Sequence, residues 1–226
     1  MKQNGEKIDH CLVGEPTSPS QMGEMMKIGR RGSMNAKITA TGIQGHSAYP
    51  DRSNNPIVAM VKLLDKLVSH QLDAGTEHFD PSTLAITSVD TGNKASNVIP
   101  AVTKATINIR FNDSHSGSSL VSWLKDEIEK VSAEYGIKFK TDFKISGESF
   151  ITPPGELSDL ISKAVKQELG VTPKLSTTGG TSDARFIKDM CPVTEFGLVG
   201  KTMHAVDEKV ETCLLYTSDA ADERQS

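Results

Sequence analysis

The period of the apolar residues between Gly32 and Gly147 constrains the fold more than any other feature of this chain. Apolar and polar residues alternate over 34–41, which is the period of a half-buried strand. From Asn55 to Val68 the apolar residues recur every three or four positions instead, which predicts a helix. The same patterns then predict strands at 83–89 and 103–111, a helix at 117–135 and a strand at 137–145. This βαββαβ order predicts a ferredoxin-like two-layer sandwich, with helices on one face of an antiparallel sheet.

The flanks of this region read as pieces of a second domain. In the βαββαβ plan the first and last strands are neighbours, so the region can be an insertion in another domain. The flanking segments predict short strands at 8–14, 22–28, 173–175 and 193–196, and helices at 156–169 and 182–189. A parallel sheet built from these strands alone would be thinly covered. We therefore expect one α/β domain, present in part, which the βαββαβ region interrupts.

Composition excludes several classes of function. The 226 residues carry a formal charge of −4 and no basic cluster beyond Arg30 and Arg31, which argues against a nucleic-acid surface. Apolar runs stay far below the roughly 20 residues that span a bilayer. The three cysteines form no CxxC pair, which favours neither a disulfide framework nor a thiolate zinc site. We expect a cytoplasmic protein with a small-molecule substrate, no membrane contact and no nucleic-acid partner.

The tail is set apart from the rest of the chain. Residues 213–226 show no sustained period and resemble read-through of library adapter sequence, so we interpret them as non-native. The alternative is a disordered native tail.

Two residues have the chemistry of metal ligands. Glu15, in VGEPT at 13–17, and His204, in TMH at 202–204, carry side chains that bind zinc well. Zinc takes three or four protein ligands, however, and few obvious partners for these two residues are present. The residues alone therefore indicate part of a metal-dependent amide hydrolase.

Six motifs in order resemble the succinyl-diaminopimelate desuccinylases. These belong to a zinc metallopeptidase superfamily that also holds acetylornithine deacetylases and aminoacylases. The matching segments are VGEPT at 13–17, GRRGS at 29–33, GIQGHSAYP at 42–50, SNVIP at 96–100, GGTSDARF at 179–186 and TMH at 202–204. GEP alone is weak, but the set is jointly specific, and the resemblance covers about residues 8–212.

The resemblance implies a two-zinc site in which a bridging Asp holds both metals and a neighbouring Glu is the general base. Glu15 matches the ligand to one zinc and His204 the ligand to the other. The family's remaining ligands precede the residue matched by Glu15 by many positions, and only fourteen residues precede it here. We therefore expect this polypeptide to be a fragment that does not hydrolyse the substrate by itself. The resemblance leaves cobalt or manganese open for the second metal.

The resemblance also implies roles for five other residues. His46 matches a catalytic imidazole that reaches the partner subunit's site and donates to the oxyanion. Arg30 and Arg110 match carboxylate contacts, and Asn97 and Thr181 match polar substrate contacts. Taken without the motif, a lone His in a turn, or an arginine on the outer face of a sheet, is more often only solvated. Glu195 reads as a polar residue at a strand end.

With the resemblance, four domain segments are expected. Residues 1–29 are an N-terminal remnant of the catalytic domain, 30–148 are the dimerisation or lid domain, 149–212 are the C-terminal part of the catalytic domain, and 213–226 are the tail. The expected assembly is a homodimer through the lid domain.

Three functions remain open at this point. The first is hydrolysis of N-succinyl-LL-2,6-diaminopimelate to succinate and LL-2,6-diaminopimelate, in lysine synthesis, by the full-length parent. A near alternative is acetylornithine deacetylase or another amidohydrolase of the superfamily, because acyl preference depends on the shape of the pocket. An alternative of another class is a non-catalytic dimerisation module, which the low count of metal ligands favours for this chain.

Overall fold

The computed structural model describes residues 7–212, so the tail at 213–226 lies outside the described residues. The described chain divides into two compact units. Unit 1 comprises the residues up to Arg31 and those from Phe150 onward, and unit 2 is Gly32–Ser149. No helix of the described residues is long and apolar enough to cross a membrane.

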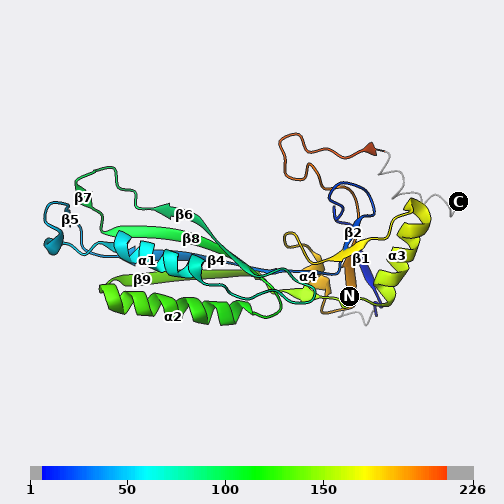
Figure 1. Cartoon of the computed structure of the whole chain (residues 1–226), viewed down its shortest axis with the longest axis horizontal. Helices are drawn as coiled ribbons and strands as arrows, with labels where there is room; N and C mark the ends of the chain where they lie inside the picture. The colour runs from blue at the N-terminus through cyan, green and yellow to red at the C-terminus, as the bar shows by residue number, and fades with distance from the viewer. Residues whose placement is uncertain (1–6, 213–226) are drawn as a thin grey trace. The chain divides into compact units, whose positions relative to one another are not determined.

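Unit 2 is the sandwich that the sequence predicts (Figure 1). Its four-stranded sheet has the order β6-β8-β4-β9, and every neighbouring pair is antiparallel. The strands are β4 (Gly32–Thr41), β6 (Thr83–Asp90), β8 (Val102–Phe111) and β9 (Lys138–Gly147). As expected, the first and last of these strands, β4 and β9, pair with each other.

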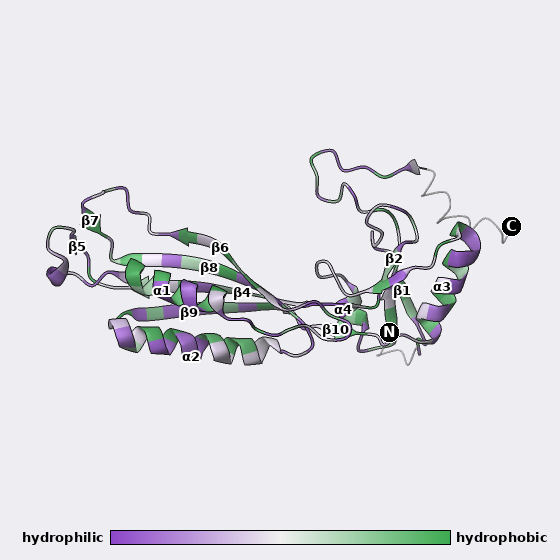
Figure 2. Cartoon of the chain, viewed as in Figure 1, coloured by the Kyte–Doolittle hydropathy of each residue, from purple (hydrophilic) through white to green (hydrophobic). Residues whose placement is uncertain are grey.

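Two helices cover one face of this sheet, α1 (Pro56–Ser69) and α2 (Gly117–Tyr135). Every second residue of β4 and β8 packs with the inward residues of both helices in one buried apolar cluster. Figure 2 shows the corresponding stripes of apolar and polar residues along the helices and strands. The predicted periods therefore place the core correctly.

Local signals set the ends of both helices. The Asn55 side chain accepts a hydrogen bond from the backbone N–H of Ile57, and Pro56 occupies the first helical position of α1. In α2, Ser116 and Ser119 form a capping box, and Gly136 ends the helix with a left-handed φ of 61°.

Unit 1 holds a small sheet with the order β1-β12-β2-β11. Its strands are β1 (Cys11–Val13), β2 (Met25–Lys27), β11 (Lys174–Ser176) and β12 (Val193–Glu195). The pairs β1–β12 and β2–β11 are parallel, but β12 and β2 run antiparallel, so the sheet is mixed rather than wholly parallel. Two short strands, β3 (Gly29–Arg30) and β10 (Phe150–Ile151), pair beside it.

The helices of unit 1 are α3 (Glu156–Leu169) and α4 (Ala184–Ile187). Gly170 ends α3 with a φ of 72°, as its place in the sequence predicts. The mixed α/β architecture, interrupted by a βαββαβ unit, is the predicted fold class.

Candidate functional site

Arg30 is the centre of a buried polar cluster in unit 1. It ends β3, and only 8% of its surface is exposed. Its Nε donates to both carboxylate oxygens of Glu195 at 3.0 Å, and its Nη2 also pairs with Glu195. Its Nη1 donates to the carbonyl oxygen of Thr178 at 3.2 Å. The guanidinium is therefore held from two sides by unit 1 itself.

Glu195 is the partner that the sequence does not reveal. It ends β12, is 1% exposed, and also accepts a hydrogen bond from the Ser182 hydroxyl. The sequence suggests only a polar residue at a strand end. The sequence could have indicated this partner in one way: Glu195 is the last residue of a strand whose other residues are apolar or small, and a buried carboxylate needs a buried cationic or hydrogen-bonding partner.

Lys27 adds a second cation to the cluster. It ends β2 and is buried, and its Nζ donates to the hydroxyls of Thr178 at 2.7 Å and Ser176 at 3.2 Å. Burial and the charge of Arg30 lower the pKa of Lys27 to about 8, although Glu195 acts in the opposite direction. Two cations and one carboxylate leave the cluster with net positive charge near neutral pH.

The turn at 178–181 lies against this cluster. Gly179 has a φ of +106°, and a Cβ at this position would collide with Nη1 of Arg30. Glycine is therefore required both by the backbone conformation and by the close approach of the guanidinium. Thr181, a predicted substrate contact, is exposed at the end of the same turn, so Arg30 and Thr181 belong to one locality.

The predicted metal ligands lie on two adjoining segments of unit 1. The segment that contains Glu15 runs beside residues 196–200, with hydrogen bonds from Phe196 N to Val13 O at 3.1 Å and from Gly200 N to Ser18 O at 2.9 Å. His204 follows in an exposed turn with a φ of 63°.

The described residues do not complete a metal site. Within 7–212, no group of three or more His, Cys, Asp or Glu side chains is placed to hold a metal ion. Glu15 and His204 supply at most two ligands, fewer than zinc takes from proteins. The donor set of residues 7–212 therefore does not fit a zinc ion on its own.

In unit 2, His46 and Asn97 lie together. Two short strands, β5 (Gly45–His46) and β7 (Val98–Ile99), pair antiparallel, and Ser47 N donates to Asn97 O at 3.0 Å. Nδ1 of His46 accepts from the backbone N–H of Ala48 at 3.1 Å, so the neutral ring carries its proton on Nε2. That proton is available as a donor, because His46 is exposed.

Arg110 lies at the other end of the same sheet. It is half-buried near the end of β8, and its Nε donates to the Asn108 side chain at 3.1 Å. Asn97 precedes β8, which begins at Val102, so roughly 25 Å of strand separates the two predicted substrate contacts. Within one copy, unit 2 does not bring Arg110 together with His46 and Asn97.

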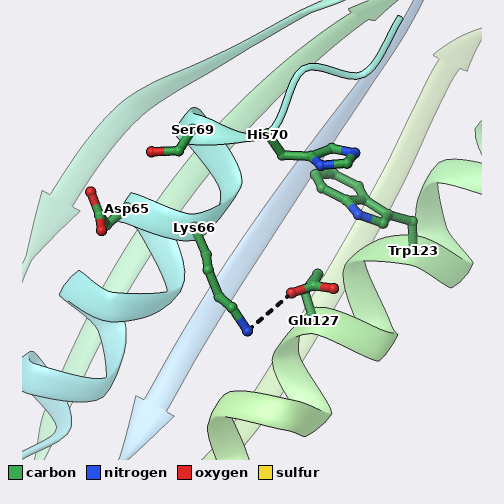
Figure 3. Close-up of a pocket in the computed structure, with 6 residues that line it drawn as sticks. All are labelled: Asp65, Lys66, Ser69, His70, Trp123 and Glu127. Carbon is green, nitrogen blue, oxygen red and sulfur yellow. Dashed lines mark ion pairs between the residues drawn. The ribbon is translucent and has the colours of Figure 1, made fainter.

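A pocket of about 370 Å³ lies between α1 and α2 of unit 2 (Figure 3). His70 stacks on Trp123 with ring centroids 5.0 Å apart, and Lys66 pairs with Glu127 at 3.4 Å. None of the predicted site residues lines this pocket.

Residues 28–136 match the family model of the peptidase dimerisation domain. The matched residues fall almost entirely in unit 2, so the sandwich of unit 2 is the part of this chain that is similar to that domain.

Over nearly its whole length the chain is similar to curated desuccinylases. It is 62% identical over 216 residues to the succinyl-diaminopimelate desuccinylase of Ruegeria pomeroyi. This alignment covers 96% of this chain and 57% of the relative. It is 64% identical over 211 residues to that of Cereibacter sphaeroides, covering 93% of this chain and 56% of the relative. The resemblance predicted from the motifs is confirmed. The chain spans about half the length of the curated relatives it matches.

Solved structures share the fold at low identity. Aminopeptidase PepT from Bacillus cereus has a TM-score of 0.77 at 17% identity, over 96% of this chain and 56% of that one. A tripeptidase from Staphylococcus aureus has a TM-score of 0.76 at 17% identity, and the match covers 91% of this chain and 52% of the tripeptidase. Both likenesses extend over residues of unit 1 and unit 2, and at this identity they show the fold alone.

Proposed function

We propose that this chain is part of a desuccinylase that hydrolyses N-succinyl-LL-2,6-diaminopimelate to succinate and LL-2,6-diaminopimelate. The observation that carries the proposal is the identity of 62–64% with succinyl-diaminopimelate desuccinylases over 93–96% of the chain. The cationic cluster of Lys27 and Arg30 supports it, because the substrate carries carboxylates. With this desuccinylase activity, the proposed role of the protein is in lysine biosynthesis by way of diaminopimelate.

The proposed metal site needs residues beyond the two in this chain. We propose that Glu15 and His204 each supply one ligand and that the remaining ligands lie outside the described residues 7–212. We propose zinc, with cobalt as the alternative at the second position. When bound, such metals polarise an amide carbonyl and activate water.

The roles of the remaining predicted residues follow from their surroundings. We propose that His46, through its exposed Nε2–H, donates to the oxygen that gains charge during hydrolysis. Arg110, Asn97 and Thr181 are proposed polar contacts to the substrate. Arg30 is a further proposed carboxylate contact, and Glu195 and the carbonyl oxygen of Thr178 hold its guanidinium in a fixed orientation.

The proposed assembly is a homodimer through unit 2. Its edge strand β6 is almost wholly exposed, and α1 packs beside it. Both elements carry exposed apolar residues, which are Val58, Val61 and Val68 on α1 and Ile86 and Val89 on β6. An apolar edge strand is a surface for pairing with a second copy. A dimer would also supply a second set of His46 and Asn97, which one copy holds far from Arg110.

Sedimentation of the chain tests this interface. Val61→Asp and Val89→Asp each place an unpaired charge in the proposed contact, so both should shift the chain to the monomer. Lys140→Asp, at an exposed position of β9 on the opposite edge of the sheet, is the control for a change of charge alone. A monomeric wild-type chain would exclude the interface.

A cytoplasmic location is also proposed. Cys11 and Cys191 are both free thiols, and Cys191 is buried, which suits a reducing compartment.

The decisive experiment measures succinate release by the full-length protein and by this chain, with zinc content determined on both. We expect turnover with bound zinc for the full-length protein, and no turnover with less than one zinc for the chain. Release of acetate from N-acetylornithine in preference to succinate would favour the acetylornithine deacetylase alternative. A full-length protein that dimerises but hydrolyses neither substrate would favour a non-catalytic dimerisation module, the alternative suggested by the low number of metal ligands within residues 7–212.

A further inference from the structure

The hydroxyl groups beside Lys27 have only one consistent hydrogen-bond arrangement. Ser176 Oγ accepts from Lys27 Nζ at 3.2 Å and from Thr178 N at 3.2 Å. A hydroxyl oxygen has two lone pairs, so Ser176 can accept no third bond. Its 2.9 Å contact with Thr178 Oγ1 must therefore be one in which Ser176 donates.

The same count fixes the role of Thr178. Its Oγ1 accepts from Lys27 Nζ at 2.7 Å and from Ser176 Oγ, which fills both lone pairs. The hydroxyl proton of Thr178 is then left without an acceptor among the described residues. Thr178 is exposed, so this proton is offered to whatever binds at the turn. Such a group can only donate, which suits a carboxylate and disfavours an ammonium group.

We propose that Thr178 is a specificity-determining donor to a substrate carboxylate, and that Lys27 and Ser176 hold it in the donating orientation. This rests on the proposed desuccinylase function and adds a contact to it. Thr178 lies at the right place, because its own carbonyl oxygen accepts from Nη1 of Arg30 at 3.2 Å. A carboxylate bound there meets the Thr178 hydroxyl and lies beside a cluster with net positive charge.

The arrangement depends on the proton of Lys27. A neutral amine has a lone pair, so above its pKa of about 8 Lys27 can accept the hydroxyl proton of Thr178 and turn it inward. The charged groups that act on Lys27 are Arg30 and Lys174, which favour loss of its proton, and Glu195, which opposes this loss. Carboxylate binding should therefore weaken as the pH rises through about 8.

The test is carboxylate binding by the 226-residue chain, followed on ¹³C-labelled threonine methyl groups with Thr181 as the reporter in every variant. Succinate and diaminopimelate are titrated separately, because the succinyl end and the amino-acid end carry the same chemistry. For the ligand that binds, Thr178→Val should raise Kd about tenfold at neutral pH, because the variant loses one hydrogen bond to a charged group. Thr178→Ser should keep the wild-type Kd. Thr172→Val, the same change at another exposed threonine of unit 1, is the matched control.

The pH dependence separates this role from a merely structural one. Succinate has the same charge at pH 7 and pH 9.5, so its Kd for the wild-type chain should rise about tenfold between them. That rise should be clearly smaller in Thr178→Val, where only the loss of the Lys27 charge remains, should vanish in Lys27→Met, and should persist in Thr178→Ser. An unchanged Kd in Thr178→Val, a rise of Kd with pH that is as large in this variant as in the wild type, or no binding of either ligand by the wild-type chain would each overturn the proposal. Failure of the full-length protein to hydrolyse its substrate is a separate result, which the binding measurement does not affect.

Discussion

Unit 2 and unit 1 bury different kinds of side chain. Unit 2 is built around one apolar cluster shared by β4, β8, α1 and α2. In unit 1 the apolar cluster around Phe150 and Val193 is small. The three charged residues that are buried among the described ones, Lys27, Arg30 and Glu195, all lie in unit 1. Apolar burial is non-directional, whereas buried charges need particular partners. Unit 2 should therefore tolerate changes that keep its pattern, while unit 1 should depend on individual contacts.

The largest effect is expected when the buried carboxylate of unit 1, Glu195, is removed, because this tests directly whether the buried charges of unit 1 need particular partners. Glu195→Ala leaves Arg30 buried without its carboxylate and should destabilise unit 1 by about 3–5 kcal/mol. Hydrogen exchange of peptides from β2 and β12 should accelerate. The fluorescence of Trp123, the only tryptophan, reports on unit 2 and should change little. Glu208→Ala, at an exposed carboxylate, is the control, and unchanged exchange in Glu195→Ala would contradict the need for specific partners.

A cavity in the apolar cluster of unit 2 should give the next largest effect. Ile107 is fully buried on β8, so Ile107→Ala should cost about 3 kcal/mol in the free energy of unfolding. Urea unfolding followed by Trp123 fluorescence measures it. Lys104→Ala, on the outward face of the same strand, should cost less than about 0.5 kcal/mol. Similar losses in the two variants would show that the cluster does not stabilise unit 2.

One carboxylate in unit 2 qualifies the comparison. Burial alone would raise the pKa of Asp73, but hydrogen bonds from Ser82, Gly75 and Asn112 outweigh it and lower this pKa from 3.8 to about 2. Because the folded pKa lies below the unfolded one, the stabilisation is present above about pH 4 and is lost as the pH falls toward 2.

The shift at Asp73 corresponds to about 2 kcal/mol. Asp73→Asn should therefore lower the urea midpoint near pH 6 and flatten its fall toward low pH, because the acceptor for Asn112 and His115 is weakened. Asp142→Asn, at an exposed site of β9, should leave the profile unchanged. Parallel profiles for the wild type and Asp73→Asn would rule out this contribution.

The smallest effect is expected at the turn 178–181 of unit 1, where it tests whether a single close contact constrains this unit. Gly179→Ala meets both a positive φ and the guanidinium of Arg30, so it should destabilise unit 1 by about 1–2 kcal/mol. Gly180→Ala has no neighbour within 4 Å of the added Cβ and should be nearly neutral. Hydrogen exchange at β11 and β12 distinguishes the two. Equal effects would mean that the approach of Arg30 does not constrain the turn.

The predictability of the two units follows the same division. The sequence predicts α2 and the strands of unit 2 well, because their periods and caps are local signals. It does not predict the β5–β7 pair, whose strands contain two residues each and whose partners are more than fifty positions apart. That pair is what brings His46 beside Asn97.

In unit 1 the sequence predicts the elements but not their partners. The short strands and α3 are found, yet the antiparallel pairing of β12 with β2 depends on contacts that no local pattern encodes. The ion pair of Arg30 with Glu195 joins residues 165 positions apart. The motifs single out Arg30 as a substrate contact by resemblance, and only the structure shows which groups orient it.

The pairing of β4 with β9 has an evolutionary consequence. Ser33 and Gly147 are partners in register, so the chain enters and leaves unit 2 at neighbouring points. A gene segment encoding such a unit can be acquired, lost or exchanged by a host domain without lengthening any connection in the host. The two units can therefore diverge at different rates, and a chimera that carries the sandwich of a distant relative between residues 32 and 149 should still be able to close its host sheet.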